Sequence, residues 1–415
     1  ATTATYNTAI GGSAGAAITT GFDNTLIGGL AGDALTDADY NTAIGKEALT
    51  SDTLGSRSTA VGWSALANQN FTSATNSYNT AMGFQAGLAI TTGTNNTLIG
   101  GLAGDALTVG EKNIALGYVA LSSDTKGNKS TALGYAALNA QNFTSATDTF
   151  NTAVGFEAGG AVTTGTINTL VGALAADALT EGNRNVAVGL GSLGSDTKGS
   201  RNTAIGVSAL GTQNFTTATD SYNTAVGFDA GLSVTTGVQN TLIGGLAGDA
   251  LTDADFNVAV GVNALSTDTL GSRSVAIGAS ALETQNFTSA TAVYNTAVGF
   301  QAGVAVTTGV QNTLIGGLAG DAITDANNNV AVGYASLSTN QRGAFNTAVG
   351  VGALQVHNPS GAANTYNTAV GFDAGNAVTT GIQNTLIGGL AGDALTEGEK
   401  NIALGYVALS SDTKG

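Results

Sequence analysis

Apolar and polar positions along the chain follow a short repeated motif. Asn or Ser is followed by Thr, Val or Ile, then by Ala or Leu, an aliphatic residue and Gly. The motif occurs 23 times, and its glycine is present each time. Apolar segments this short and this rich in β-branched residues predict β-strands rather than helices. Glycine, at 61 of 415 residues, argues further against helix.

A longer period organises these motifs. Copies of 72 residues follow one another without insertion or deletion, and each begins at an aromatic residue: Tyr6, Tyr78, Phe150, Tyr222, Tyr294 and Tyr366. Within a copy the motif glycines are 17, 17, 17 and 21 residues apart, as in Gly11, Gly28, Gly45, Gly62 and Gly83. A glycine at one point of every circuit predicts a corner that needs positive φ or a close approach of two backbones. We therefore expect an all-β fold, in which residues 1–415 form a single continuous parallel β-solenoid of 23 coils that is part of a longer fibre. At about 4.8 Å per coil its length would be roughly 110 Å.

Each of the five motif positions forms a column when the coils are stacked, and two further expectations follow from these columns. Asn in the first column predicts a ladder of amide side chains, each bonded to its neighbour one coil away. Adjacent strand residues point to opposite faces, and the third and fourth columns are both apolar, as in Leu26 and Ile27. One face fills the coil and the other needs a cover, so we expect copies of the chain to pack lengthwise. The alternative is an exposed alanine column that costs little.

Charge and composition exclude several classes of partner. The chain has 12 basic and 28 acidic residues and a net charge of −16, which argues against nucleic-acid binding. It has no cysteine, and therefore no disulfide framework or thiolate metal site. No stretch reaches the apolar length that spans a bilayer, so we expect no membrane insertion by this segment.

The motifs resemble a known family. Asn79-Thr80-Ala81-Met82-Gly83, Asn223-Thr224-Ala225-Val226-Gly227 and Ser58-Thr59-Ala60-Val61-Gly62 are similar to the head repeats of trimeric autotransporter adhesins, and similar repeats occur in some bacteriophage tail fibres. The resemblance covers essentially the whole chain. It implies a homotrimeric, left-handed parallel β-roll that is exposed on a bacterial surface or a virion.

Few residues are candidates for catalysis or metal binding. The single histidine, His357, lies in a polar loop and is expected to be solvated. Ser and Thr are abundant, but no His partner recurs with them to act as a base. The acidic run from Asp33 to Asp39 is expected to be a solvated turn, with a calcium site as the alternative. We accordingly predict no catalytic, cofactor-binding or metal-binding residues, and no enzymatic activity.

The four extra residues in every fourth coil form the most distinctive loops. They carry an aromatic residue at one position, namely Phe71, Phe143, Phe215 and Phe287, which Pro359 replaces in the fifth copy. Insertions in solenoids often lie on a binding face. Each Phe is therefore either a contact residue or a side chain tucked against its own coil.

Three classes of function fit these features. The first is an extracellular attachment fibre, the shaft or head of an adhesin on a cell or virion surface, whose partners are other copies of itself and a host receptor or glycan. The second is a purely structural surface filament. The third is an ice-binding solenoid, because Thr recurs in the second column, although Val or Ile interrupts that column at positions 114, 186, 258, 275, 330 and 402.

Overall fold

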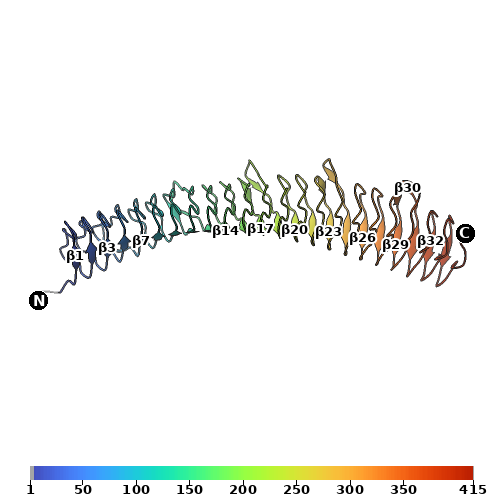
Figure 1. Ribbon diagram of the computed structural model, residues 1–415, viewed down its shortest axis with the longest axis horizontal. Coiled ribbons are helices and arrows are strands. Elements are labelled where there is room, and N and C mark those ends of the chain that lie inside the picture. Colours follow the sequence, from blue (N-terminus) through green and yellow to red (C-terminus); the bar gives the residue numbers. More distant parts are fainter. Residues whose placement is uncertain (1–3, 415) are drawn as a thin grey trace. The chain divides into compact units, whose positions relative to one another are not determined.

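The computed structural model describes residues 4–414, and within this range it contains strands and turns but no helix. The chain is a parallel β-solenoid, as the repeat predicts, with one three-residue strand in each of its 23 coils. It divides into two compact units, one formed by residues 1–202 and 214–220 and the other by residues 203–213 and 221–415. Figure 1 shows that successive coils within each unit follow one another in chain order, each with its strand.

The three-residue strands occupy the second to fourth columns of the motif and end at the corner glycine. In the first unit they are β1 (Thr8–Ile10), β2 (Thr25–Ile27), β3 (Thr42–Ile44), β5 (Thr59–Val61), β7 (Thr80–Met82), β8 (Thr97–Ile99), β9 (Ile114–Leu116), β11 (Thr131–Leu133), β13 (Thr152–Val154), β14 (Thr169–Val171) and β15 (Val186–Val188). In the second unit they are β17 (Thr203–Ile205), β19 (Thr224–Val226), β20 (Thr241–Ile243), β21 (Val258–Val260), β23 (Val275–Ile277), β25 (Thr296–Val298), β26 (Thr313–Ile315), β27 (Val330–Val332), β29 (Thr347–Val349), β31 (Thr368–Val370), β32 (Thr385–Ile387) and β33 (Ile402–Leu404). Within each unit every strand except the last pairs in parallel with the strand of the next coil, column for column, as Thr25 does with Thr42.

Short two-residue strands join the third coil of a copy to the long loop of the fourth. They pair in parallel as β4 (Gly55–Ser56) with β6 (Thr75–Asn76), β10 (Gly127–Asn128) with β12 (Thr147–Asp148), β16 (Gly199–Ser200) with β18 (Thr219–Asp220), β22 (Gly271–Ser272) with β24 (Thr291–Ala292), and β28 (Gly343–Ala344) with β30 (Ala363–Asn364). The long loops therefore start and end at fixed points of the coil.

The corner glycines meet both conditions that the repeat predicts. Gly11, Gly28, Gly45, Gly62 and Gly83 all have φ between +135° and +142°. A Cβ atom built on Gly28 would lie 2.5 Å from the carbonyl oxygen of Gly45 in the next coil. A side chain at this corner would therefore be strained and would also push adjacent coils apart.

Left-handed backbone also occurs at non-glycine residues, which the sequence did not reveal. Every coil has positive φ five residues before its corner glycine and two and four residues after it, as at Tyr40, Glu47 and Leu49 (φ 59°, 59° and 53°). Such a conformation costs roughly 1–2 kcal/mol for an L-residue. Hydrogen bonds to neighbouring coils offset this cost, because the amide of Glu47 donates to the Gly29 carbonyl (2.9 Å) and that of Leu49 to the Ala65 carbonyl (3.0 Å).

The core is thin and built from matched large and small residues. The middle strand residue is buried in every coil after the first, and it is Leu only in the second coil of each copy, as at Leu26. A Cβ on Gly32, four residues after the corner of that coil, would lie 2.8 Å from Leu26 Cδ2. In the third and fourth coils Leu49 and Leu66 occupy the equivalent of Gly32, and the middle strand residue is Ala. Between the second coil and the third and fourth, the large side chain therefore moves from the strand to the turn, in keeping with a close-packed interior.

Candidate functional site

The outer face of the strands carries exposed apolar side chains in both units. The third strand residue, one place before the corner glycine, is aliphatic and at least one-third exposed in most coils, as at Ile44 (36%), Ile243 (38%) and Met82 (46%). Its neighbour in the middle of the strand points inward, as strand parity requires. The exposed set comprises Ile10, Ile44, Met82, Leu116 and Val154 in the first unit, and Ile205, Ile243, Ile277, Ile315, Val370, Ile387 and Leu404 in the second.

A second exposed apolar column follows the corner glycine. The residue directly after that glycine is large and exposed at Trp63, Phe84, Tyr118, Tyr135, Phe156 and Leu190 in the first unit, and at Val207, Phe228, Val262, Phe300, Tyr334, Val351, Phe372 and Tyr406 in the second. Neighbouring rings contact one another, with centroids 5.9 Å apart for Tyr118 and Tyr135 and 5.2 Å for Tyr135 and Phe156. Sequence reasoning missed this column, although the recurrence of an aromatic residue directly after the corner glycine was its signal.

We call the third strand residues and the residues directly after the corner glycines, together with the Thr, Val or Ile that opens each strand, the outer face. Lys46 is the only charged residue in these three columns, although the chain has a net charge of −16. Rows of exposed apolar side chains such as these usually mark an interaction site. The expectation that both strand faces are apolar is confirmed, and the exposed apolar column is Ile and Val rather than Ala.

Basic side chains lie next to aromatic rings at several places in the column five residues before the corner glycine. The guanidinium of Arg57 lies 4.7 Å from the ring centroid of Tyr40 and 5.9 Å from that of Tyr78. Arg273 is placed in the same way between Phe256 and Tyr294, at 5.3 and 5.8 Å. These cation–π contacts tie successive coils together and hold several of the few basic residues in place.

The Asn column forms the buried ladder that was predicted, with mixed side-chain and backbone partners. The Oδ1 atom of Asn24 accepts a hydrogen bond from the backbone amide of Asn41 (2.9 Å), and Asn41 Oδ1 does the same for Ser58 (2.8 Å). The Nδ2 atom of Asn41 donates to the carbonyl of Gly55 (3.0 Å). These amides are buried and hydrogen-bonded within the stack, so the column is structural.

The four loop phenylalanines are packed into the coils. Phe71, Phe143, Phe215 and Phe287 are only 5–8% exposed. A Cβ on Gly55 would lie 2.7 Å from Phe71 Cδ2, so the ring covers the second glycine corner of the preceding coil. This arrangement favours the packing alternative over a row of contact residues.

A buried polar network lies beneath the long loops of the first, second and fourth copies, and sequence reasoning missed it. In the first copy Gln69 Nε2 donates to Asp52 Oδ2 (2.6 Å) and to Ser58 Oγ (2.8 Å), and Gln69 Oε1 accepts from Asn79 Nδ2 (2.9 Å). Asp52 Oδ1 accepts the amides of Gly55 (3.0 Å) and Phe71 (3.2 Å). The recurrence of Asp and Gln 17 residues apart, at one position of consecutive coils, was the available signal.

His357 is buried, so the expectation of a solvated histidine was wrong. It occupies the place of Gln69 in the fifth copy and is 0% exposed. Burial lowers the pKa of its imidazole to about 4, and the nearby backbone carbonyl of Thr379 offsets only part of that effect. The loop looks polar in sequence, but its first turn points this side chain into the coil.

The acidic run of the first copy is held by donors from adjacent coils. Asp33 accepts a hydrogen bond from Thr50 Oγ1 (2.5 Å), Asp39 accepts the amide of Phe22 (3.0 Å), and Asp37 accepts the hydroxyl of Thr20. These carboxylates have separate partners. Among residues 4–414 there is no group of three His, Cys, Asp or Glu that could hold a metal ion.

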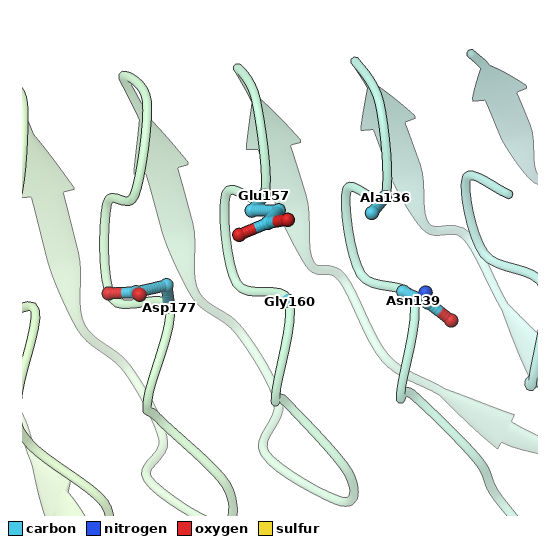
Figure 2. Close-up of a pocket in the computed structure, with 5 residues that line it drawn as sticks. All are labelled: Ala136, Asn139, Glu157, Gly160 and Asp177. Carbon is cyan, nitrogen blue, oxygen red and sulfur yellow. The ribbon is translucent and has the colours of Figure 1, made fainter. Parts of the chain in front are cut away.

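A shallow acidic cleft of about 190 Å³ lies across three neighbouring coils in the first unit, lined by Ala136, Asn139, Glu157, Gly160 and Asp177 (Figure 2). Figure 2 shows the carboxylates of Glu157 and Asp177 on adjacent coils. Burial raises the pKa of Asp177, and the charge of Glu157 raises it further. The cleft offers two carboxylates and one side-chain amide.

No part of the described chain forms a helix of the length and apolarity needed to cross a membrane. A scan against models of known protein families finds no match to this chain, and a search of curated protein sequences finds none either.

Proposed function

We propose that this chain is a non-catalytic section of an extracellular attachment fibre on a cell or virion surface, whose copies associate lengthwise as a homotrimer. The observation that supports it most strongly is the outer face, which presents apolar columns coil after coil in both units. The trimeric state and the surface location follow from the resemblance to adhesin head repeats.

A second copy of the same chain fits the outer face better than other partners do. The face recurs with the period of the coils, so an identical chain placed in register meets it along its whole length. The net charge of −16 would make other surfaces of two copies repel each other. The three columns of the outer face carry only one charged residue. Covering a half-exposed Ile or Val contributes about 1 kcal/mol, so the coils of one unit together supply on the order of 10 kcal/mol before the cost of association.

The backbone arrangement suits a mechanical spacer. Residues of each coil donate backbone hydrogen bonds in both directions along the stack, as Glu47 does to Gly29 and Leu49 does to Ala65. The recurring Asn, Asp and Gln residues hydrogen-bond neighbouring coils to one another, through the Asn ladder and the buried networks. A rigid spacer of this kind holds a receptor- or glycan-binding part of the fibre away from its base.

The association is tested by measuring the mass of the purified chain at micromolar concentration by sedimentation equilibrium. We expect three times the chain mass. A variant with Ile243→Glu, Ile315→Glu and Ile387→Glu is expected to be monomeric, because each glutamate would be buried against a partner. The matched control adds the same three charges at exposed loop positions, as Ala74→Glu, Ala146→Glu and Ala290→Glu, and should remain trimeric.

A monomeric wild-type chain would refute lengthwise association. The alternative of a purely structural filament rests on the same face and differs in having no receptor. Binding of the fluorescently labelled trimer to glycan arrays and to cell surfaces separates the two, since a structural filament would bind neither.

A further inference from the structure

The fifth copy breaks a buried hydrogen-bond network that the other copies share. In the second copy Gln141 Nε2 donates to Asp124 Oδ2 (2.6 Å) and to Ser130 Oγ (2.8 Å), as in the first. In the fourth copy Gln285 makes the same two bonds, to Asp268 (2.6 Å) and Ser274 (3.0 Å). Each of these amides thus bridges a buried carboxylate and a hydroxyl group.

The equivalent residues of the fifth copy are Asn340 and His357, and they do not bond to each other. The side chain of Asn340 folds back on its own turn, accepting from the Gly343 amide (2.8 Å) and donating to the Gly343 carbonyl (2.7 Å). His357 is fully buried, and neither of its ring nitrogens has a hydrogen-bond partner among the described residues. A Cβ on Gly343 would lie 3.1 Å from His357 Nε2 and 3.2 Å from Pro359 Cγ, which places the ring beneath the loop.

No charged group is placed to stabilise an imidazolium at this point. The coil of His357, residues 350–370, contains no other charged residue. The preceding coil contributes only Arg342, which is exposed and pairs with Asp325 (3.7 Å). The following coil contributes only Asp373, whose carboxylate accepts from Asn376 Nδ2 (3.2 Å). The carboxylate that lies here in the first, second and fourth copies is absent, because Asn340 replaces it.

We propose that the loop of residues 355–365 is an acid-sensitive opening point, at which protonation of His357 releases the loop from the coil. A buried imidazolium without a charged partner is unfavourable, whereas an open loop lets water solvate it. Opening would unpair β28 from β30 and expose backbone groups of both strands. The corresponding loops of the other copies have Gln in place of His357 and would stay closed.

The direction of the pH dependence follows from linkage. The folded-state pKa of His357, about 4, is below the value of 6.5 for a solvated histidine. The open form therefore binds protons more readily, and the closed form loses stability as pH falls from about 6.5 towards 4. Between pH 7 and pH 4.5 the opening equilibrium should rise by roughly 60-fold.

The test is hydrogen–deuterium exchange of the intact chain at pH 7.0, 5.5 and 4.5, with rates corrected for the pH dependence of intrinsic exchange. We expect protection of residues 355–365 to fall by tens of fold at pH 4.5. The equivalent segments 67–77, 139–149 and 283–293 serve as controls within the same molecule and should keep their protection. Unchanged protection of residues 355–365 would overturn the proposal.

Two variants separate titration of His357 from a loop that is merely weak. His357→Gln should remove the pH dependence. If this variant is already open at pH 7, the double variant Asn340→Asp with His357→Gln restores the residue pair of the other copies and should close the loop at every pH. Because His357 is the only histidine of the chain, its ring proton signal also reports its titration directly. Titration near pH 6.5 in a loop that stays protected would refute the proposal.

Discussion

The Nε2 atom of Gln69 donates a 2.6 Å hydrogen bond to Asp52 Oδ2 on the preceding coil, and both residues are completely buried. The Asp52 carboxylate also accepts hydrogen bonds from the backbone amides of Gly55 and Phe71, so its partners are hydrogen-bond donors rather than a cation. The first long loop is thus held to the coil beneath it by this carboxylate.

Asp52→Asn should destabilise the first long loop by about 1–3 kcal/mol. The substitution keeps the shape but places an NH₂ group or a weaker acceptor against donors, which leaves buried polar groups unsatisfied. Local stability can be measured by hydrogen exchange of residues 67–77. Asp23→Asn is the control, because Asp23 is exposed. Equal effects of the two substitutions would contradict a special role for the Asp52 contact.

Gly244→Val should disrupt the stack locally, whereas Gly245→Val should be tolerated. Gly244 has φ of +135°, and a Cβ there would collide with the Gly261 carbonyl oxygen, while a Cβ on Gly245 meets no atom within 4 Å. Positive φ alone costs around 1–2 kcal/mol for an L-residue. Thermal unfolding of the two variants gives the comparison. A Gly244→Val protein that melts like the wild type would show that this corner does not need glycine.

Phe143→Ala is expected to destabilise the second long loop by about 3–5 kcal/mol, since it removes a buried ring and leaves a cavity. The adjacent Thr144 is exposed, and Thr144→Ala should change little. Hydrogen exchange of residues 139–149 measures both effects. If Phe143→Ala instead weakened binding to a surface while loop stability was unchanged, the ring would have a contact role.

Asp249→Asn should stabilise the protein at pH 7 but not at pH 3. Burial raises the pKa of Asp249, the charge of Asp229 adds to the effect, and its Oδ1 atom is buried without a hydrogen-bond partner among the described residues. A raised folded-state pKa means that stability is highest while the carboxyl is protonated, and is lost as pH rises through that pKa. Chemical denaturation at the two pH values measures the difference. Destabilisation of the same size at both pH values would show that the carboxylate is needed for another reason.

Much of this architecture could be predicted from the order of residues alone. The 72-residue period, the strands and the corner glycines at Gly11 and its equivalents are visible because every coil repeats the same local requirement. The corner glycine recurs because its position needs positive φ and a close backbone contact. Each three-residue strand likewise repeats the same order of inward-facing and outward-facing residues. Local rules that recur in every coil add up to an unambiguous prediction.

The tertiary structure decided which side chains of the turns face inward. Phe71 and His357 lie among polar residues, where strand parity gives no guidance, and both are buried because the turns contain left-handed residues that redirect the chain. The same is true of Asp52 and Gln69, which are far apart in sequence and meet only when consecutive coils stack. Side-chain direction in an irregular turn depends on dihedral angles and on neighbours one coil away, and neither is encoded in a local pattern of apolar and polar residues.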